Sequence, residues 1–156
     1  MYRDENHKDM TLTNFERLLS NTLYYKRFFP YYNHNVLAGI DEDGKGVCFT
    51  YDSVGSGEAI QYGATGSGHQ LLMSILDAQL KNRRGWARQG NALLAEPVDF
   101  NIPGAVPLDA EEAMALIKDA MTSAAERDIH TGDTLEIVLM RKDMPVHYET
   151  FQLRRD

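Results

Sequence analysis

The clearest structural pattern in the chain is VLAGIDEDGKGVCFTYD, which spans residues 36–52. Its two apolar runs flank an Asp43-Gly44 pair, and glycine adopts the positive φ that a tight turn between antiparallel strands requires. After the turn, large apolar side chains occupy every second position, at Val47, Phe49 and Tyr51. An alternation with a period of two residues is typical of a strand with one buried face. The stretch therefore predicts a β-hairpin.

A helix precedes this hairpin. Apolar residues recur at helical spacing over residues 12–23, and Thr13 with Glu16 has the S/T-x-x-E form of a capping box. Pro30 lacks a backbone N–H and stops the helical pattern. The sequence therefore predicts a helix over about 12–26 that is capped at Thr13.

A third strand and two more helices follow the hairpin. Residues 58–65 have strand character and lead into the turn Gly66-Ser67-Gly68, after which apolar positions follow a helical period over 71–80. Asp109 is a good N-cap for the next helix, whose apolar face runs to Ala124. Met114 and Met121 on that face are expected to fill the core.

Two strands, over 135–141 and 146–153, close the chain, so the element order predicts an α+β fold with two groups of strands. Three strands and two strands offer little sheet for these helices and leave open edges. Either a partner supplies further strands, or the chain is the carboxy-terminal part of a longer one.

Between residues 82 and 108 the periodicity disappears. Three prolines, three glycines and the cluster Arg83, Arg84 and Arg88 predict a long exposed loop over about 84–107. The arginines are either solvated or contact an acidic neighbouring subunit.

The composition excludes several classes of function. A chain of 156 residues predicts one domain, and 16 basic against 23 acidic residues give a formal charge of −7, which disfavours nucleic-acid binding. No window approaches the roughly 18 apolar residues of a membrane span, so we expect no membrane partner. The single cysteine, Cys48, is typical of a reducing compartment, so we expect cytoplasmic and nuclear localisation.

The sequence gives little support for a metal-binding or phosphate-binding site. The five histidines show no H-x-x-x-H or H-E-x-x-H spacing, so we expect no metal and no cofactor. The run Gly63–Gly68 opens a helix after a strand, where backbone N–H groups can hold a phosphate, but it lacks the P-loop lysine. A tight turn between strand and helix is the simpler interpretation.

A serine-type hydrolase is the alternative function. The sequence contains the residue types of a catalytic triad: Ser67 as nucleophile, His69 or His130 as base and Asp128 as orienting acid. The G-x-S-x-G elbow that exposes a nucleophilic serine is absent from the sequence.

The stretch AAERDIHTGD, residues 124–133, joins the end of a helix to a strand. A purely structural reading exists, in which Asp128 and Thr131 accept backbone hydrogen bonds and Gly132 supplies the left-handed cap of the helix.

Several blocks together resemble one family. FFPYY at 28–32, AGIDEDGKG at 38–46, Tyr51-Asp52 with Val54-Gly55-Ser56, Gly66-Ser67 and the 124–133 stretch are similar to proteasome β subunits, in particular the non-catalytic one at the sixth position of the ring. The resemblance implies a four-layer αββα sandwich of the N-terminal nucleophile hydrolase type. Residues 1–156 would then be the carboxy-terminal portion of a single domain, incomplete at the amino terminus.

The resemblance also implies a role without catalysis. Active family members use an amino-terminal threonine that is exposed by cleavage after glycine, and no Gly-Thr pair occurs in these 156 residues. Ser67, Asp128, Thr131 and Gly132 match family site positions and are expected to be remnants, so no residue is assigned as catalytic. The expected function is that of a structural subunit of the 20S core particle, with other α and β subunits as partners and unfolded or ubiquitinated proteins as substrates of the complex.

Overall fold

The computed structural model describes residues 2–81 and 108–154. The chain divides into two compact units, each with its own sheet: Met1–Gly63 with Met140–Val146, and Ala64–Leu139 with His147–Asp156. The predicted loop over 84–107 lies outside the described residues. Within the described ranges, no helix is both long and apolar enough to cross a lipid bilayer.

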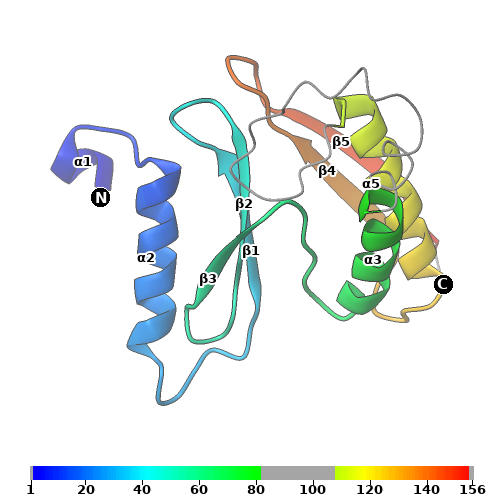
Figure 1. The fold of residues 1–156 in the computed structure, drawn as a ribbon, viewed down its shortest axis with the longest axis horizontal. Coiled ribbons are helices and arrows are strands. Elements are labelled where there is room, and N and C mark those ends of the chain that lie inside the picture. Colours follow the sequence, from blue (N-terminus) through cyan, green and yellow to red (C-terminus); the bar gives the residue numbers. More distant parts are fainter. Residues whose placement is uncertain (1, 82–107, 155–156) are drawn as a thin grey trace. The chain divides into compact units, whose positions relative to one another are not determined.

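The first unit joins two helices to a three-stranded antiparallel sheet (Figure 1). Its elements in chain order are α1 (Tyr2–Asn6), α2 (Leu12–Tyr25), β1 (Asn35–Ile40), β2 (Gly46–Tyr51) and β3 (Gly57–Ile60). The order in the sheet is β1-β2-β3, with Leu37 opposite Phe49 and Phe49 opposite Ala59. Gly44 has φ +82° and its N–H donates to the carbonyl of Asp41. The predicted hairpin and its Asp43-Gly44 turn are confirmed.

Helix α2 covers Leu12–Tyr25, close to the predicted range of about 12–26, but its cap lies two residues before the predicted Thr13. Thr11 has extended backbone angles, and its side-chain oxygen accepts a hydrogen bond from the backbone N–H of Asn14 at 3.3 Å. Thr13 already lies inside the helix, so the prediction of a Thr13 cap is wrong. The two threonines share the same chemistry, and Thr11 becomes the cap because the chain is extended there.

Helix α2 contacts the sheet through β1 and through the turn between β2 and β3. A Cβ added at Gly39 would lie 2.8 Å from the side chain of Leu12, so the missing side chain lets the helix approach the strand. The Ser20 hydroxyl donates to the carbonyl of Gly55 at 2.7 Å. Gly55 has φ +86°, and a Cβ there would lie 2.4 Å from the backbone oxygen of Ser20. Glycine at this position is therefore required both by conformation and by space.

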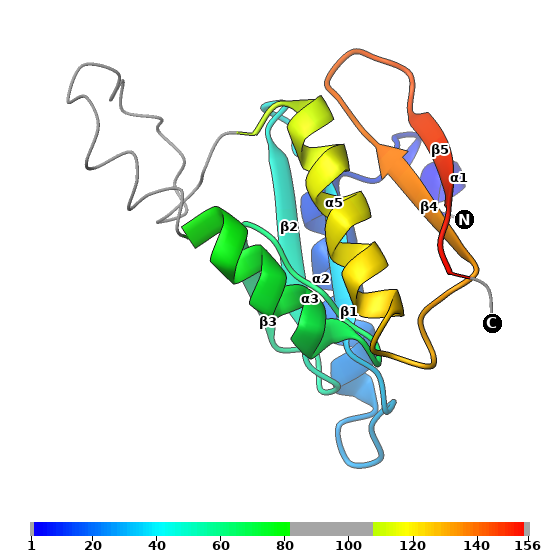
Figure 2. The ribbon, with the colours of Figure 1, turned by 90° about the vertical axis from the view of Figure 1, so that its right-hand side faces the viewer.

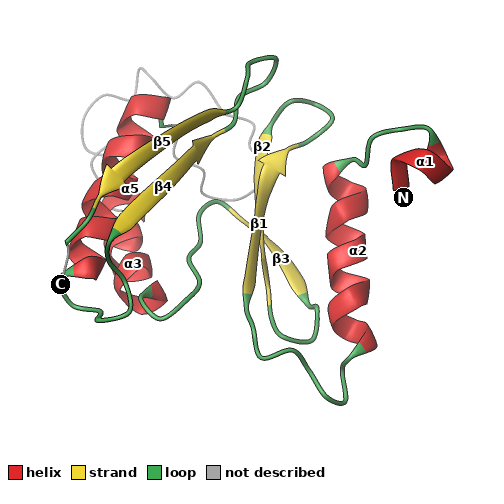
Figure 3. Ribbon diagram, turned by 180° about the vertical axis from the view of Figure 1, so that it is seen from behind, coloured by secondary structure: helices red, strands yellow, loops and turns green. Residues whose placement is uncertain are grey.

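The second unit is a β-hairpin with helices on one face. Its elements are α3 (His69–Leu76), the π-helical turn η1 (Asp77–Lys81), α5 (Ala110–Ala125), β4 (Thr134–Leu139) and β5 (His147–Gln152). Helices α3 and α5 lie side by side (Figure 2). Figure 3 shows both helices behind the β4–β5 hairpin. Register pairs Leu135 with Phe151 and Leu139 with His147.

The core of the second unit lies between α5 and its sheet. Four residues form the buried cluster and three partly buried side chains pack against it: Ala125, Leu135, Ile137 and Leu153, with Met114, Met121 and Phe151. The predicted cap of α5 is confirmed, because the Asp109 carboxylate accepts from the backbone N–H of Glu112 at 2.7 Å. Lys118 on α5 forms an ion pair with Glu149 on β5 at 2.5 Å. Apolar contact and the ion pair between Lys118 and Glu149 therefore help to hold this helix to the hairpin.

The predicted α+β class is confirmed, and in each unit a helix packs on an antiparallel sheet, α2 on β1 in the first and α5 on β4 in the second. The third strand was predicted over residues 58–65, but β3 ends at Ile60, so the prediction was too long. A Cβ at Gly63 would lie 2.4 Å from Ile60, so the chain folds back on the strand end there. Neither α1 nor the π-helical turn η1 was predicted from the sequence.

Candidate functional site

Two loops of the second unit meet at the candidate site. The first is the turn Gly66-Ser67-Gly68 that leads into α3, in which Gly66 has φ +103° and its carbonyl accepts from the backbone N–H of His69 at 3.2 Å. The second loop follows the end of α5 at Ala125 and contains Asp128. No side chain caps the start of α3. The shape of the first loop therefore depends on the backbone conformation of its glycines, in particular the positive φ of Gly66.

Local hydrogen bonds to the backbone orient Asp128. Its N–H donates to the carbonyl of Ala124 at 2.8 Å, which continues the hydrogen bonding of α5. Its Oδ1 accepts from the backbone N–H of His130 at 3.1 Å, a local side-chain to backbone bond between residues two apart. The other carboxylate oxygen is thereby left facing α3.

Two hydroxyl groups donate to this second oxygen. Ser67 Oγ donates to Asp128 Oδ2 at 2.6 Å, and Thr131 Oγ1 donates to the same atom at 2.7 Å. These bonds, with that of Ser67 the largest contribution, hold the pKa of Asp128 below its usual value, since they stabilise the ionised form. We refer to Ser67, Asp128 and Thr131 as the Asp128 cluster.

Gly68 allows the two loops to come this close. A Cβ at Gly68 would lie 3.1 Å from Thr131 Oγ1 and 3.2 Å from Asp128 Oδ2, which is tighter than ordinary van der Waals contact. Sequence reasoning singled out the glycine-rich turn but missed this role. The available signal was the Gly-Ser-Gly run directly before a helix.

Gly132 does not supply the predicted left-handed cap. The left-handed residue in this loop is Asp133, with φ +59°, and Gly132 is not among the glycines of positive φ. The nearest atom to a Cβ at Gly132 would be the carbonyl oxygen of Arg154 at 3.3 Å. Asp133 exchanges hydrogen bonds with the end of the hairpin, donating to Arg154 at 3.0 Å and accepting from Leu153 at 2.9 Å. The loop therefore turns where it meets β5, because these bonds compensate the cost of the conformation.

The geometry of the cluster does not activate Ser67 as a nucleophile. The serine proton points at a carboxylate whose pKa is lowered, and such a carboxylate is a weak base. His69 Nδ1 lies 3.0 Å from the carbonyl of Gly66, and His130 reaches Asp128 through its backbone N–H. The structure therefore brings Ser67 and Asp128 together, but as a donor and an acceptor that satisfy each other.

The same geometry disfavours a phosphate in the turn before α3. The Asp128 carboxylate lies within hydrogen-bond distance of Ser67, so an anion at this helix start would meet a negative charge. The tight-turn interpretation of Gly63–Gly68 is therefore the better one.

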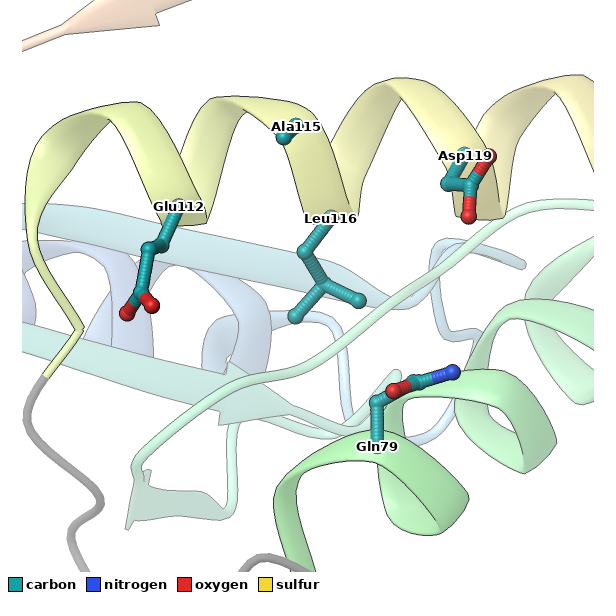
Figure 4. Close-up of a pocket in the computed structure, with 5 residues that line it drawn as sticks. All are labelled: Gln79, Glu112, Ala115, Leu116 and Asp119. Atoms are coloured by element: carbon teal, nitrogen blue, oxygen red, sulfur yellow. The ribbon is translucent and has the colours of Figure 1, made fainter.

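An open cavity lies elsewhere in this unit, between η1 and α5 (Figure 4). Its volume is about 430 Å³, and its lining residues are Gln79, Glu112, Ala115, Leu116 and Asp119. The carboxylates of Glu112 and Asp119, with the apolar side chains of Ala115 and Leu116 between them, provide neither a nucleophile nor a set of ligands that converge on one point. Among residues 2–81 and 108–154, no group of three or more His, Cys, Asp or Glu side chains is placed to hold a metal ion.

Comparison with known proteins assigns this fold to a family. The family model described as proteasome subunit matches residues 1–84, more than half of the chain. The chain belongs to the proteasome subunit family.

Individual relatives narrow the similarity to β subunits. The chain is 47% identical over all 156 residues to proteasome subunit beta type-1 of Arabidopsis thaliana, and 41% identical over 155 residues to the protein of that name in Dictyostelium discoideum. It is 39% identical over 153 residues to proteasome subunit beta type-6 of Saccharomyces cerevisiae. The alignments cover 100%, 99% and 98% of this chain and 65%, 59% and 60% of those relatives. The chain thus spans less than two thirds of the length of the relatives it matches.

Proposed function

We propose that this chain acts as a non-catalytic β-type subunit of the 20S proteasome core particle. Its role would be to complete a heteromeric ring with other α and β subunits, while other subunits cut the unfolded or ubiquitinated protein substrates. The similarity to named β subunits over the whole chain supports the assembly role.

The observation that carries the non-catalytic part is the Asp128 cluster. Ser67, Thr131 and the backbone of His130 all donate to one carboxylate, and a carboxylate whose pKa is lowered is a weak base for activating a hydroxyl group. The cluster therefore supports a subunit that contributes surfaces rather than serine chemistry.

The experiment is affinity purification of the tagged chain from its own cells, followed by native electrophoresis and two covalent probes. A fluorophosphonate reports an activated serine, and a peptide epoxyketone reports an amino-terminal threonine. We expect the chain to migrate in a particle with other proteasome α and β subunits and to remain unlabelled by both probes. Ser67→Ala is the matched control for the first probe. Labelling that disappears in Ser67→Ala, or migration of the chain without other proteasome subunits, would contradict the proposal.

We further propose that the chain resides in the cytoplasm and the nucleus. The support is the single cysteine, Cys48, which fits a reducing compartment. Fluorescence microscopy of the tagged chain tests this, and signal confined to a secretory or vesicular compartment would contradict it.

A further inference from the structure

The largest exposed apolar feature of the first unit lies at the end of α2 and in the segment that follows. Six aromatic residues in a run of nine are exposed: Tyr24, Tyr25, Phe28, Phe29, Tyr31 and Tyr32. Phe28 is 94% exposed and Tyr32 is 92% exposed, so these rings are not covered by the part of the chain that the structure describes. We call these six residues the aromatic surface. Contiguous exposed aromatic area is typical of a protein interaction site.

The backbone under these rings is held by short-range hydrogen bonds. Arg27 N–H donates to the Tyr24 carbonyl at 3.0 Å, and Phe29 N–H donates to the Lys26 carbonyl at 3.0 Å. Asn33 N–H donates to the Tyr31 carbonyl at 2.8 Å. The segment forms the loop that leads from the end of α2 to β1 (Figure 1). Binding would therefore require little further ordering of the chain.

Two cations are built into the aromatic surface. The guanidinium carbon of Arg27 lies 5.9 Å from the ring centroid of Tyr24 and 5.4 Å from that of Phe28. The Lys26 ammonium lies 5.4 Å from the ring centroid of Tyr31. These distances are within cation–π range, so each cation is positioned by a ring while it can still attract an anion.

The charge of this region is opposite to that of the rest of the chain. Residues 17–40 contain three basic residues, Arg17, Lys26 and Arg27, and none of the 23 acidic residues of a chain whose formal charge is −7. An acidic partner segment would therefore be attracted here and repelled elsewhere. A second copy of the chain, an anionic membrane and a nucleic acid all fit less well, because each would also meet the overall negative charge.

We propose that the aromatic surface, with Lys26 and Arg27, docks an acidic segment of a neighbouring proteasome subunit. Carboxylates of that segment would pair with the two cations, and its aliphatic groups would cover the rings. This inference rests on the proposed function, since it needs a particle in which the chain has neighbours.

The test is photo-crosslinking in the assembled particle. The tagged full chain carries Tyr32→p-benzoylphenylalanine, and crosslinked peptides are identified by mass spectrometry after native purification. We expect one principal crosslink, to a segment of another proteasome subunit that is rich in Asp and Glu. Crosslinks to a second copy of the chain, to lipid, to RNA or to a segment without acidic residues would overturn the proposal, as would the absence of crosslinks in a particle that contains the chain.

A charge-reversed variant tests the role of the cations. Lys26→Glu with Arg27→Glu should lower the crosslink yield about tenfold, because attraction becomes repulsion. Lys45→Glu is the matched control, an exposed cation in the turn before β2, and should leave the yield unchanged. Far-ultraviolet circular dichroism of both variants confirms that the fold is intact, and the milder Lys26→Ala with Arg27→Ala pair replaces the reversal if it is not. Equal yields in the reversed variant and the control would overturn the proposal.

The inference and the proposed function can fail separately. A particle that contains the chain but gives no acidic crosslink leaves the proposed function standing and removes this inference. A chain that never purifies with other proteasome subunits overturns both.

Discussion

The Asp128 cluster and the aromatic surface differ in where their bonding capacity is directed. In the cluster, two hydroxyl groups and one backbone N–H converge on a single carboxylate. In the aromatic surface, the rings of Phe28 and Tyr32 are exposed by more than nine tenths and two cations lie against neighbouring rings. Polar groups that already hydrogen-bond to each other are not available to bind a substrate. Covering exposed rings with a partner removes apolar surface from water, which makes binding more favourable. The contrast agrees with our proposal that this chain acts through a surface.

The largest effect is expected from breaking the support of the helix that carries the aromatic surface. In Gly55→Ala, the new Cβ would meet the backbone oxygen of Ser20 at 2.4 Å and the residue would keep a left-handed φ. Conformational strain and overpacking together should cost about 3 kcal/mol of unfolding free energy. Urea denaturation of the full chain measures this.

Gly46→Ala is the control for Gly55→Ala. Gly46 has no atom within 4 Å of a built Cβ, so its substitution should change the unfolding free energy by no more than about 0.5 kcal/mol. Equal losses in the two variants would show that the contact between Gly55 and Ser20 does not support α2.

The second effect concerns charge in the cluster. Because the pKa of Asp128 is lowered in the folded chain, the unfolded chain binds more protons at acid pH, and stability rises as pH rises. Asp128→Asn keeps one oxygen but loses this contribution. The variant should therefore be less stable than the native chain at neutral pH, and the difference should shrink as pH falls below about 4 and through the folded pKa.

Denaturation curves at several pH values test the Asp128→Asn prediction. Asp119→Asn, the same change of charge on the exposed side of α5, is the control and should stay closer to the native chain in stability at neutral pH, because it leaves the Asp128 cluster intact. A difference between Asp128→Asn and the native chain that stays constant down to acid pH would contradict the role given to the ionised carboxylate.

A third and smaller effect separates the two hydroxyl donors. The Ser67 bond contributes more to the lowered pKa of Asp128 than the Thr131 bond does. Ser67→Ala should therefore raise the pKa of Asp128 further than Thr131→Val does, as followed by NMR titration of the Asp128 carboxyl carbon. A larger rise in Thr131→Val would reverse the assigned order.

The smallest effect on stability is expected in the aromatic surface itself. Phe28→Ala removes a ring that is 94% exposed, so the unfolding free energy of the chain should change by no more than about 0.5 kcal/mol. Thermal unfolding followed by circular dichroism checks this. A loss of 2 kcal/mol or more, a size typical of core truncation, would show that the ring packs within its own chain.

Local chemistry explains which parts of the fold were predictable. The Asp43-Gly44 turn and the Asp109 cap each depend on residues a few positions apart, and both are confirmed. The cap of α2 was misassigned because Thr11 and Thr13 are chemically alike, and only the backbone angles distinguish them. The turn after α5 was misassigned to Gly132, since Asp133 adopts the left-handed conformation through bonds to the distant end of β5.

The candidate site shows the limit of local reasoning more sharply. Ser67 and Asp128 are 61 positions apart, so no local pattern states that they bond. The triad hypothesis and the resemblance to the family both singled out these residues, whereas their geometry shows that each satisfies the other. The contact made possible by Gly68 was missed because it depends on the packing of two loops.

The most direct measurement is a competition between the native chain and one variant at a time for incorporation into the proteasome particle inside one cell. Native chain and variant carry different tags, and mass spectrometry measures their ratio in the purified proteasome particle. We expect Phe28→Ser with Tyr32→Ser to be depleted about tenfold relative to the native chain, as for the loss of interface anchors, and Ser67→Ala to enter at near parity and to leave peptide hydrolysis unchanged. Parity of the aromatic variant, together with loss of hydrolysis in Ser67→Ala, would contradict a role carried by the surface and restore one carried by the cluster.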